Sequence, residues 1–197
     1  MKTVLLATNN TKKRDELKRL LKIRGLTVKT LSSLKRVPAM IENGRTFKAN
    51  AIKKALPVSR CTDCLVLADD SGLEVDILRG APGIRSARYA GPGQDDEKNL
   101  DKLLAVLRNV PAPQRGAQFR CVIALAKKGR LLGTVEGICR GRIGFARAGS
   151  RGFGYDPVFV IPQRGRTFAQ MSARGKDRLS HRAKAIGKAR PLIKQYA

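Results

Sequence analysis

The stretch LADDSGLEVDILRGAPGIRSARYAG, residues 67–91, is the most informative part of this sequence of 197 residues. It continues an apolar run that begins at Leu65, and it places Asp69 and Asp70 directly before Ser71 and Gly72. An apolar strand that ends in an acid pair and a tight turn presents carboxylates at the edge of a sheet. There they serve as metal ligands or as a general base. We therefore expect chemistry at this strand end.

The acid pair stands out against the charge of the whole chain. The sequence has 41 Lys and Arg against 15 Asp and Glu, a formal net charge of +26 at pH 7. A basic surface of this size attracts polyanions without specificity, so a nucleic-acid-binding protein is one open hypothesis. Solvated surface lysines and arginines are the other. The aromatic content of 5%, with no Trp, argues against dedicated recognition of nucleic acid.

Length and composition indicate one globular domain over residues 1–197, with room for two lobes. No apolar run approaches the length of a membrane helix, and the run at 4–7 is too short for the core of an export signal. Four cysteines are few for this length, which fits a reducing compartment. We therefore expect a cytoplasmic protein without a membrane partner.

The hydrophobic pattern predicts mixed secondary structure. Strands are expected at 3–7, 26–31, 65–68 and 157–161, and a hairpin of 118–126 and 131–139 is expected to turn at Lys128 and Gly129. Helices are expected at 12–24, closed by Gly25, at 46–56, stopped by Pro57, at 98–107 and at 180–196. Strands and helices that do not strictly alternate indicate an α/β or α+β sheet fold.

A polar cluster follows the first expected strand. Its members are Thr8, Asn9, Asn10, Thr11, Lys12 and Lys13. A strand that runs into a polar loop and a helix start offers backbone N–H groups and the positive end of the helix dipole to a phosphate. The glycines of a Walker loop are missing from this stretch. An ordinary capped helix with solvated lysines is the alternative.

Carboxylates opposite such a loop are chemically coherent, because Mg²⁺ takes carboxylate, water and phosphate oxygens. Asp70 is the candidate, and two solvated acids before a turn are the alternative. Glu42 and Lys54, taken alone, are indistinguishable from surface residues.

Two later segments are candidates for recognising a base. Glycines flank Phe153 in the run GFGYDP at 152–157, which lets the backbone approach a flat ligand while the ring stacks on it. A structural turn is the alternative. Further along lie Lys176 and the pair His181–Arg182, which suit base or phosphate recognition. A lone histidine is more often structural.

Together these segments resemble the inosine triphosphate pyrophosphatase family, house-cleaning enzymes for non-standard purine nucleoside triphosphates. Five ordered motifs carry the resemblance over about 175 residues. They are T-x-N-x-x-K-x-x-E from Thr8, E-x-G-x-T-F-x-x-N-A-x-x-K-A from Glu42, the unbroken signature from Asp69 to Tyr89, F-G-Y-D-P-x-F from Phe153, and S-H-R from Ser180.

The resemblance implies a two-lobed α/β fold with a long mixed sheet beneath a deep cleft, usually in a homodimer. It implies that water attacks the α-phosphorus of ITP, dITP or XTP and releases a nucleoside monophosphate and pyrophosphate. A related pyrophosphatase for modified pyrimidine nucleotides is the nearer alternative. A basic nucleic-acid binder on the same scaffold is the more distant one.

The resemblance also implies residue roles. Asp70 would act as the general base and, with Glu42, hold Mg²⁺. Residues 8–13 would cradle the triphosphate, Lys54 and Lys176 would add charge, and Ser71 would touch the substrate. The base pocket would be lined by Phe153, Gly154, Tyr155 and Asp156, and the 6-oxo edge would be read by His181 and Arg182.

The sequence departs from the family pattern mainly by losing acids. Asn43 stands where Thr is common, and Ala49, Gln170 and Gly175 stand where Glu is frequent. If Ala49 or Gln170 replaces a carboxylate near the metal, we expect a shift in metal affinity or in the pH optimum.

Overall fold

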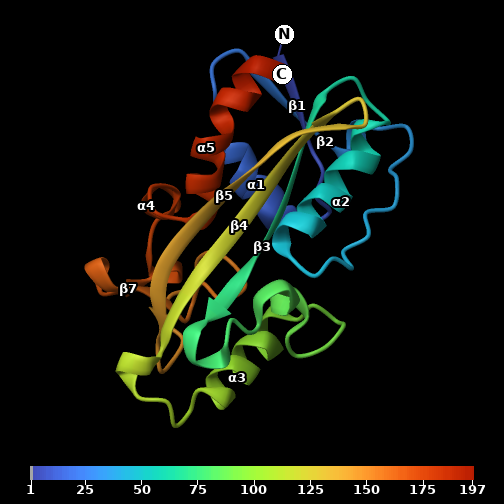
Figure 1. The fold of residues 1–197 in the computed structure, drawn as a ribbon. Coiled ribbons are helices and arrows are strands. Elements are labelled where there is room, and N and C mark those ends of the chain that lie inside the picture. The colour runs from blue at the N-terminus through green and yellow to red at the C-terminus, as the bar shows by residue number, and fades with distance from the viewer. Residues whose placement is uncertain (1) are drawn as a thin grey trace. The chain divides into compact units, whose positions relative to one another are not determined.

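The computed structural model describes residues 2–197, and Figure 1 traces the chain. Seven strands form one sheet in the order β2-β1-β3-β4-β5-β6-β7. Their bounds are β1 Lys2–Leu6, β2 Leu26–Thr30, β3 Leu65–Val75, β4 Gly116–Lys127, β5 Arg130–Ile143, β6 Phe159–Ile161 and β7 Arg166–Thr167. β1 runs parallel to β2 and β3, whereas β6 runs antiparallel to β5 and β7. The sheet is therefore mixed, which confirms the predicted α/β class.

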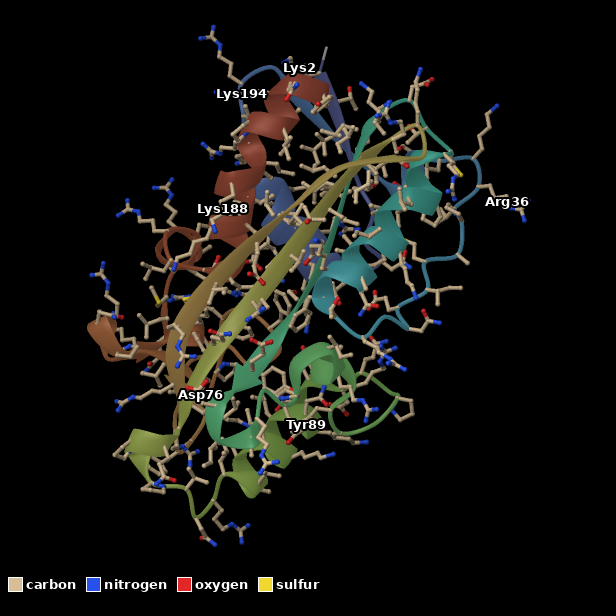
Figure 2. The ribbon with its side chains drawn as sticks, in the orientation of Figure 1. Lys2, Arg36, Asp76, Tyr89, Lys188 and Lys194 are labelled. Carbon is tan, nitrogen blue, oxygen red and sulfur yellow. The ribbon has the colours of Figure 1, made fainter. Side chains whose placement is uncertain are left out.

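Five α-helices accompany the sheet: α1 Thr11–Leu20, α2 Phe47–Ser59, α3 Asp96–Val106, α4 Ala173–Asp177 and α5 His181–Tyr196. Within residues 2–197, none of them combines the length and the apolar character needed to cross a membrane. Basic side chains project from the ribbon, and Figure 2 labels Arg36 after β2 and Lys188 and Lys194 on α5.

The chain divides into two compact units. Unit 1 comprises Met1–Asp70, Cys121–Gly137 and Arg182–Ala197, and unit 2 comprises Ser71–Arg120 and Ile138–His181. The strands β3, β4 and β5 each continue from one unit into the other. The single two-lobed domain and its deep cleft stay predictions.

Alternation along β3 builds the core of unit 1. Leu65 and Leu67 pack in a cluster with residues of α1 and α5, whereas Val66 and Ala68 pack in a second cluster with residues of α2. Because successive side chains of a strand point to opposite faces, α1 and α5 cover one face and α2 covers the other (Figure 1). The same alternation assigns Asp69 to the α1–α5 face and Asp70 to the α2 face.

The core of unit 2 is aromatic. The Phe119 ring lies 4.6 Å from the Phe159 ring and 6.0 Å from the Phe168 ring, measured between centroids. Leu100 and Leu103 of α3 join this cluster, as do Leu73 and Val75 from the end of β3.

The predicted strand end at the acid pair is wrong. β3 runs through Asp69, Asp70, Ser71 and Gly72 to Val75, so the acid pair lies inside a strand. The strand continues because residues beyond the pair have their own core to enter in unit 2. Both carboxylates are buried, at 1% and 5% exposure, which requires charged partners in place of water.

Two predicted helix ends are also wrong, and the hairpin is confirmed. α1 ends at Leu20 rather than at residue 24, because Leu21 turns into the core of unit 1 as the cap of the helix. α2 continues through Pro57 to Ser59, and the residue that follows the proline, Val58, is fully buried. Between β4 and β5, Lys128 and Gly129 have φ of 49° and 77°, the left-handed pair that a tight two-residue hairpin turn requires.

Candidate active site

Asp70 lies at the centre of a polar cluster in unit 1. Its Oδ2 accepts a hydrogen bond from Asn50 Nδ2 at 2.9 Å, and its Oδ1 lies 3.6 Å from Lys54 Nζ. The same ammonium donates to Glu42 Oε1 at 3.1 Å. Burial raises the pKa of Asp70 above its ordinary value, and Glu42 adds to the rise, while Lys54, Lys13 and the hydrogen bond from Asn50 oppose it. A carboxylate with a raised pKa is a better proton acceptor near neutral pH.

The segment that carries Glu42 is tied to α2 by three successive contacts. Lys54 bonds Glu42, Lys53 Nζ donates to Asn43 Oδ1 at 2.7 Å, and Gly44 N donates to Asn50 Oδ1 at 2.7 Å. Residues 50–54 of α2 therefore orient the segment that carries Glu42, and Asn50 also orients Asp70. Asn43, a departure from the family pattern, supplies one of these contacts.

Lys54 is buried at 4% exposure between acids. Burial lowers its pKa, but the charges of Asp69, Asp70 and Glu42 outweigh burial and raise the pKa above its ordinary value. The side chain is therefore a permanent cation at the point where Glu42 and Asp70 converge.

Asp69 belongs to a second ion network, on the other face of β3. Its Oδ2 lies 3.7 Å from Lys13 Nζ and 3.5 Å from Arg182 Nε, and Arg182 also bonds the buried Glu16. Burial alone would raise the pKa of Asp69, but Lys13, Arg182 and Lys54 lower it to about 2. Asp69 is thus a structural anion that links β3 to α1 and α5.

The polar cluster after β1 is the start of a helix, as expected. Asn10 caps α1 and accepts from Lys13 N at 2.9 Å, and Thr8 Oγ1 accepts from Asn10 N at 3.2 Å. Asn9, Thr11 and Lys12 are exposed. Lys13, predicted to lie one turn into the helix, extends toward Asp69.

In unit 2, Asp156 organises the glycine-flanked loop. Its Oδ2 accepts from Phe153 N at 2.9 Å and pairs with Lys176 Nζ at 2.5 Å. Gly152 has φ of 81°, and a Cβ there would lie 2.0 Å from the same oxygen, so this position requires glycine. The Lys176 ammonium lies 5.2 Å from the centroid of the Phe153 ring, a cation–π contact.

The remaining predicted substrate-binding residues of unit 2 differ in burial. Gly154 N donates to Asp96 Oδ2 at 3.1 Å, and Ser71 is half-buried. Tyr155 lies in the core of unit 2 and donates its hydroxyl to Ser86 O at 2.9 Å; burial raises its pKa. His181 is 3% exposed, and its ring stacks on Phe119 with centroids 4.7 Å apart.

The predicted site residues thus form two groups. Unit 1 holds residues 8–13, Glu42, Lys54, Asp70 and Arg182, and unit 2 holds Ser71, residues 153–156, Lys176 and His181. Sequence reasoning gave no role to Asn50 or Glu16, although both lie in the quoted motifs. Asn50 orients Asp70, and Glu16 pairs with Arg182.

The lost acids share one structural position. Ala49, Gln170 and Gly175 each donate a backbone N–H to a capping hydroxyl three residues earlier, from Thr46, Thr167 and Ser172 respectively. This is the position at which Glu or Gln completes a capping box. Gln170 completes one, since its Oε1 accepts from Thr167 N at 2.9 Å. The departures therefore concern helix starts.

The donor set of Glu42 and Asp70 fits a magnesium ion. Both offer hard carboxylate oxygens, and both approach one cation, the Lys54 ammonium. Mg²⁺ is commonly held by one or two carboxylates and completed by water and substrate phosphates. Residues 2–197 contain no group of three or more His, Cys, Asp or Glu side chains arranged for a metal.

Comparison with known proteins decides the family. A family model described as the Ham1 family matches residues 4–192. The chain belongs to the Ham1 family.

Two solved Ham1 proteins have the same fold. One from Staphylococcus aureus has a TM-score of 0.86 at 38% identity and covers all of both chains. One from Coxiella burnetii has a TM-score of 0.88 at 35% identity and covers 99% of this chain and 100% of its own. A relative from Desulforamulus reducens, named dITP/XTP pyrophosphatase, is 47% identical over 96% of this chain and 94% of its own. The resemblance drawn from the motifs is confirmed.

Proposed function

We propose that this protein hydrolyses dITP, XTP and ITP to the nucleoside monophosphate and pyrophosphate, and so keeps these bases out of DNA and RNA. The observation that carries the proposal is Asp70, a buried carboxylate with a raised pKa beside Asn50, Lys54 and Glu42. The name dITP/XTP pyrophosphatase, borne by relatives at 42–47% identity over more than nine-tenths of this chain, supports it.

Asp70 takes the proton from the attacking water in this proposal. Its Oδ2 is fixed by Asn50, which leaves Oδ1 as the proton acceptor, and Lys54 holds that oxygen in place. Water adds to the α-phosphorus, the bond from that phosphorus to the bridging oxygen breaks, and the electron pair leaves with pyrophosphate.

The phosphates are bound by unit 1. The N-terminal backbone groups of α1, with residues 8–13 around them, offer N–H donors and a positive dipole end to the triphosphate. Lys54 contributes a permanent positive charge, which offsets the charge that develops on the leaving phosphates.

Base recognition belongs to unit 2 in this proposal. The half-buried Phe153 ring stacks on the purine, and Asp156 fixes the loop that presents it. Lys176 and His181 carry the polar contacts that favour a 6-oxo purine over a 6-amino purine. Tyr155 supports the loop from the core. The resemblance implies that Arg182 reads the 6-oxo edge together with His181, but Arg182 is buried and paired with Asp69 and Glu16, so we assign it a positioning role instead.

Mg²⁺ belongs to the proposal as the cofactor held by Glu42 and Asp70. When bound, it polarises phosphate oxygens and lowers the pKa of nearby water. A homodimer, implied by the resemblance, and a cytoplasmic location, expected from the few cysteines, are proposed as well.

A substrate panel tests the function. Purified protein with Mg²⁺ is incubated separately with dITP, ITP, XTP, ATP, GTP and modified pyrimidine triphosphates, and pyrophosphate is measured. We expect turnover of the first three at least about a hundredfold above ATP, because a site built to bond the 6-oxo edge is left unpaired by a 6-amino group. GTP shares the 6-oxo group, so its turnover measures whether the site also excludes a 2-amino group. Equal turnover of ATP, or a preference for pyrimidines, contradicts the proposal.

Asp70→Asn tests the assigned base. We expect a loss of at least about a hundredfold in kcat, the usual contribution of a general base. Asp63→Asn, which removes an acid whose side chain is 94% exposed in the same unit, is the matched control and should keep its activity. Thermal unfolding of both variants checks the fold. Full activity of a folded Asp70→Asn variant removes Asp70 from the mechanism.

A further inference from the structure

Unit 2 contains a pocket with no role in the proposed hydrolysis. Its volume is about 690 Å³, and four arginines line it: Arg151, Arg164, Arg166 and Arg178. Glutamines, a serine and two apolar side chains complete the wall, and no Asp or Glu of the described chain takes part. The residues assigned to the base, 153–156, Lys176 and His181, do not line it either.

The positive charge of the pocket is uncompensated. Across residues 2–197, the structure gives none of the four arginines a carboxylate partner. Between residues 142 and 178 the sequence has eight Lys and Arg against two Asp. One of these acids, Asp156, is the partner of Lys176. Four guanidinium groups around one pocket repel one another unless an anion enters.

Short-range contacts assemble the pocket from separate segments. Arg164 and Arg166 flank Gly165 in the turn between β6 and β7, and Arg178 caps α4. Thr167, next to Arg166, is buried and donates to Ala148 O at 2.6 Å. Arg151 N donates to Ala169 O at 3.1 Å. These bonds hold together the backbone segments that carry Arg151 and Arg166.

Phosphate is the anion that clustered arginines recognise best, since the planar fork donates two parallel hydrogen bonds to it. A single small phosphate is usually held by buried, converging donors. Here the four arginines are exposed and spread around an open wall, with Met171 and Leu179 beside them. This layout suits successive phosphates of a chain, with apolar contact to its sugars.

We propose that this pocket binds the phosphodiester backbone of single-stranded nucleic acid, a binding activity beyond the proposed hydrolysis. No aromatic side chain lines the pocket in the described structure, so the proposed contact is with phosphates rather than with stacked bases and is independent of base sequence. The net charge of +26 steers the polyanion toward the protein, and the basic side chains in Figure 2 contribute to that field.

Fluorescence anisotropy with a labelled oligothymidylate of about 20 nucleotides tests the proposal, with EDTA present and salt varied. If Arg164 neutralises one phosphate, Arg164→Gln makes the fall of log K with log salt less steep by about 0.7. At about 0.1 M salt, this corresponds to about a fivefold loss of affinity. The double variant with Arg178→Gln should lose about twenty-five-fold.

Gln170→Glu offers a nearly isosteric second test. Glu keeps the oxygen that accepts from Thr167 N, so the capping box is retained, but the pocket gains a negative charge. We expect weaker binding of the oligonucleotide at unchanged thermal stability. Arg36→Gln is the control, because it removes an exposed arginine outside the pocket (Figure 2).

The proposal is overturned if the pocket variants bind like the unmodified protein, or if Arg36→Gln loses as much affinity as Arg164→Gln. It is also overturned if tripolyphosphate binds as tightly as the oligonucleotide, since the pocket then serves a compact anion. Hydrolysis of dITP is measured on the same protein preparations in a separate assay with Mg²⁺ and without EDTA, so failure of the proposed enzyme activity is seen separately.

Discussion

The Asp69→Asn substitution probes the buried ion network that links β3 to α1 and α5. In the folded protein, burial opposes the charged form of Asp69, but Lys13, Arg182 and Lys54 lower its pKa from 3.8 to about 2. One pKa unit corresponds to about 1.4 kcal/mol, so the lowered pKa contributes about 2.5 kcal/mol to stability at neutral pH. Removing one partner from a buried ion pair costs more in total, about 3 kcal/mol or more.

The sign of the pH dependence follows from the lowered pKa. The contribution of Asp69 is fully present above its unfolded pKa, near 4, and is lost as the pH falls toward the folded value, near 2. At about pH 3, roughly 1 kcal/mol of it is lost. The gap in unfolding free energy between the unmodified protein and Asp69→Asn should therefore narrow by about 1 kcal/mol between about pH 6 and pH 3.

Urea unfolding in EDTA, followed by circular dichroism at each pH, measures that gap. Asp63→Asn is the control for removing a carboxylate from the surface of the same unit. A gap that stays constant, or that widens as the pH falls, refutes the assignment of Asp69 as an anion held by buried cations.

Two further predictions concern local structure. Arg115 is 1% exposed and donates to four carbonyl oxygens, those of Leu107, Val110, Ile143 and Gly144. Arg115→Lys should lower the unfolding free energy by about 3 kcal/mol, because lysine lacks the planar guanidinium group that reaches these oxygens. Ala49→Glu should raise the unfolding free energy by about 0.5–1 kcal/mol, since it completes the capping box with Thr46 at a helix that has no acid in its first turn. Urea unfolding checks both predictions. An Arg115→Lys variant with unchanged unfolding free energy contradicts the first argument, and an Ala49→Glu variant less stable than Ala49→Gln contradicts the second.

Much of the fold could be predicted from local pattern. The apolar runs marked the inner strands, and Lys128–Gly129 marked the hairpin, because alternation and turn chemistry are properties of neighbouring residues. The course of β3 through the acid pair could not be predicted in this way. Asp69 and Asp70 are tolerated inside a strand because Lys13, Lys54 and Arg182 arrive from three different helices.

The candidate site could likewise be predicted only in part. Motifs selected Asp70, Glu42 and Lys54 together, and the structure gathers these three around one ammonium group. The environment of Arg182 was beyond local reasoning, because its partner Glu16 lies 166 positions away in the sequence. The positions of the lost acids are explained by the hydroxyl caps, because Ala49 and Gly175 each lie three residues after a capping Thr or Ser.

The most direct test of the central claim is the hydrolysis of dITP in water enriched in ¹⁸O, with mass spectrometry of both products. Attack of water at the α-phosphorus predicts dIMP and pyrophosphate, with the label in dIMP and none in pyrophosphate. Label in pyrophosphate, or release of orthophosphate with dIDP, places the attack at another phosphorus and contradicts the account of Asp70 and its neighbours.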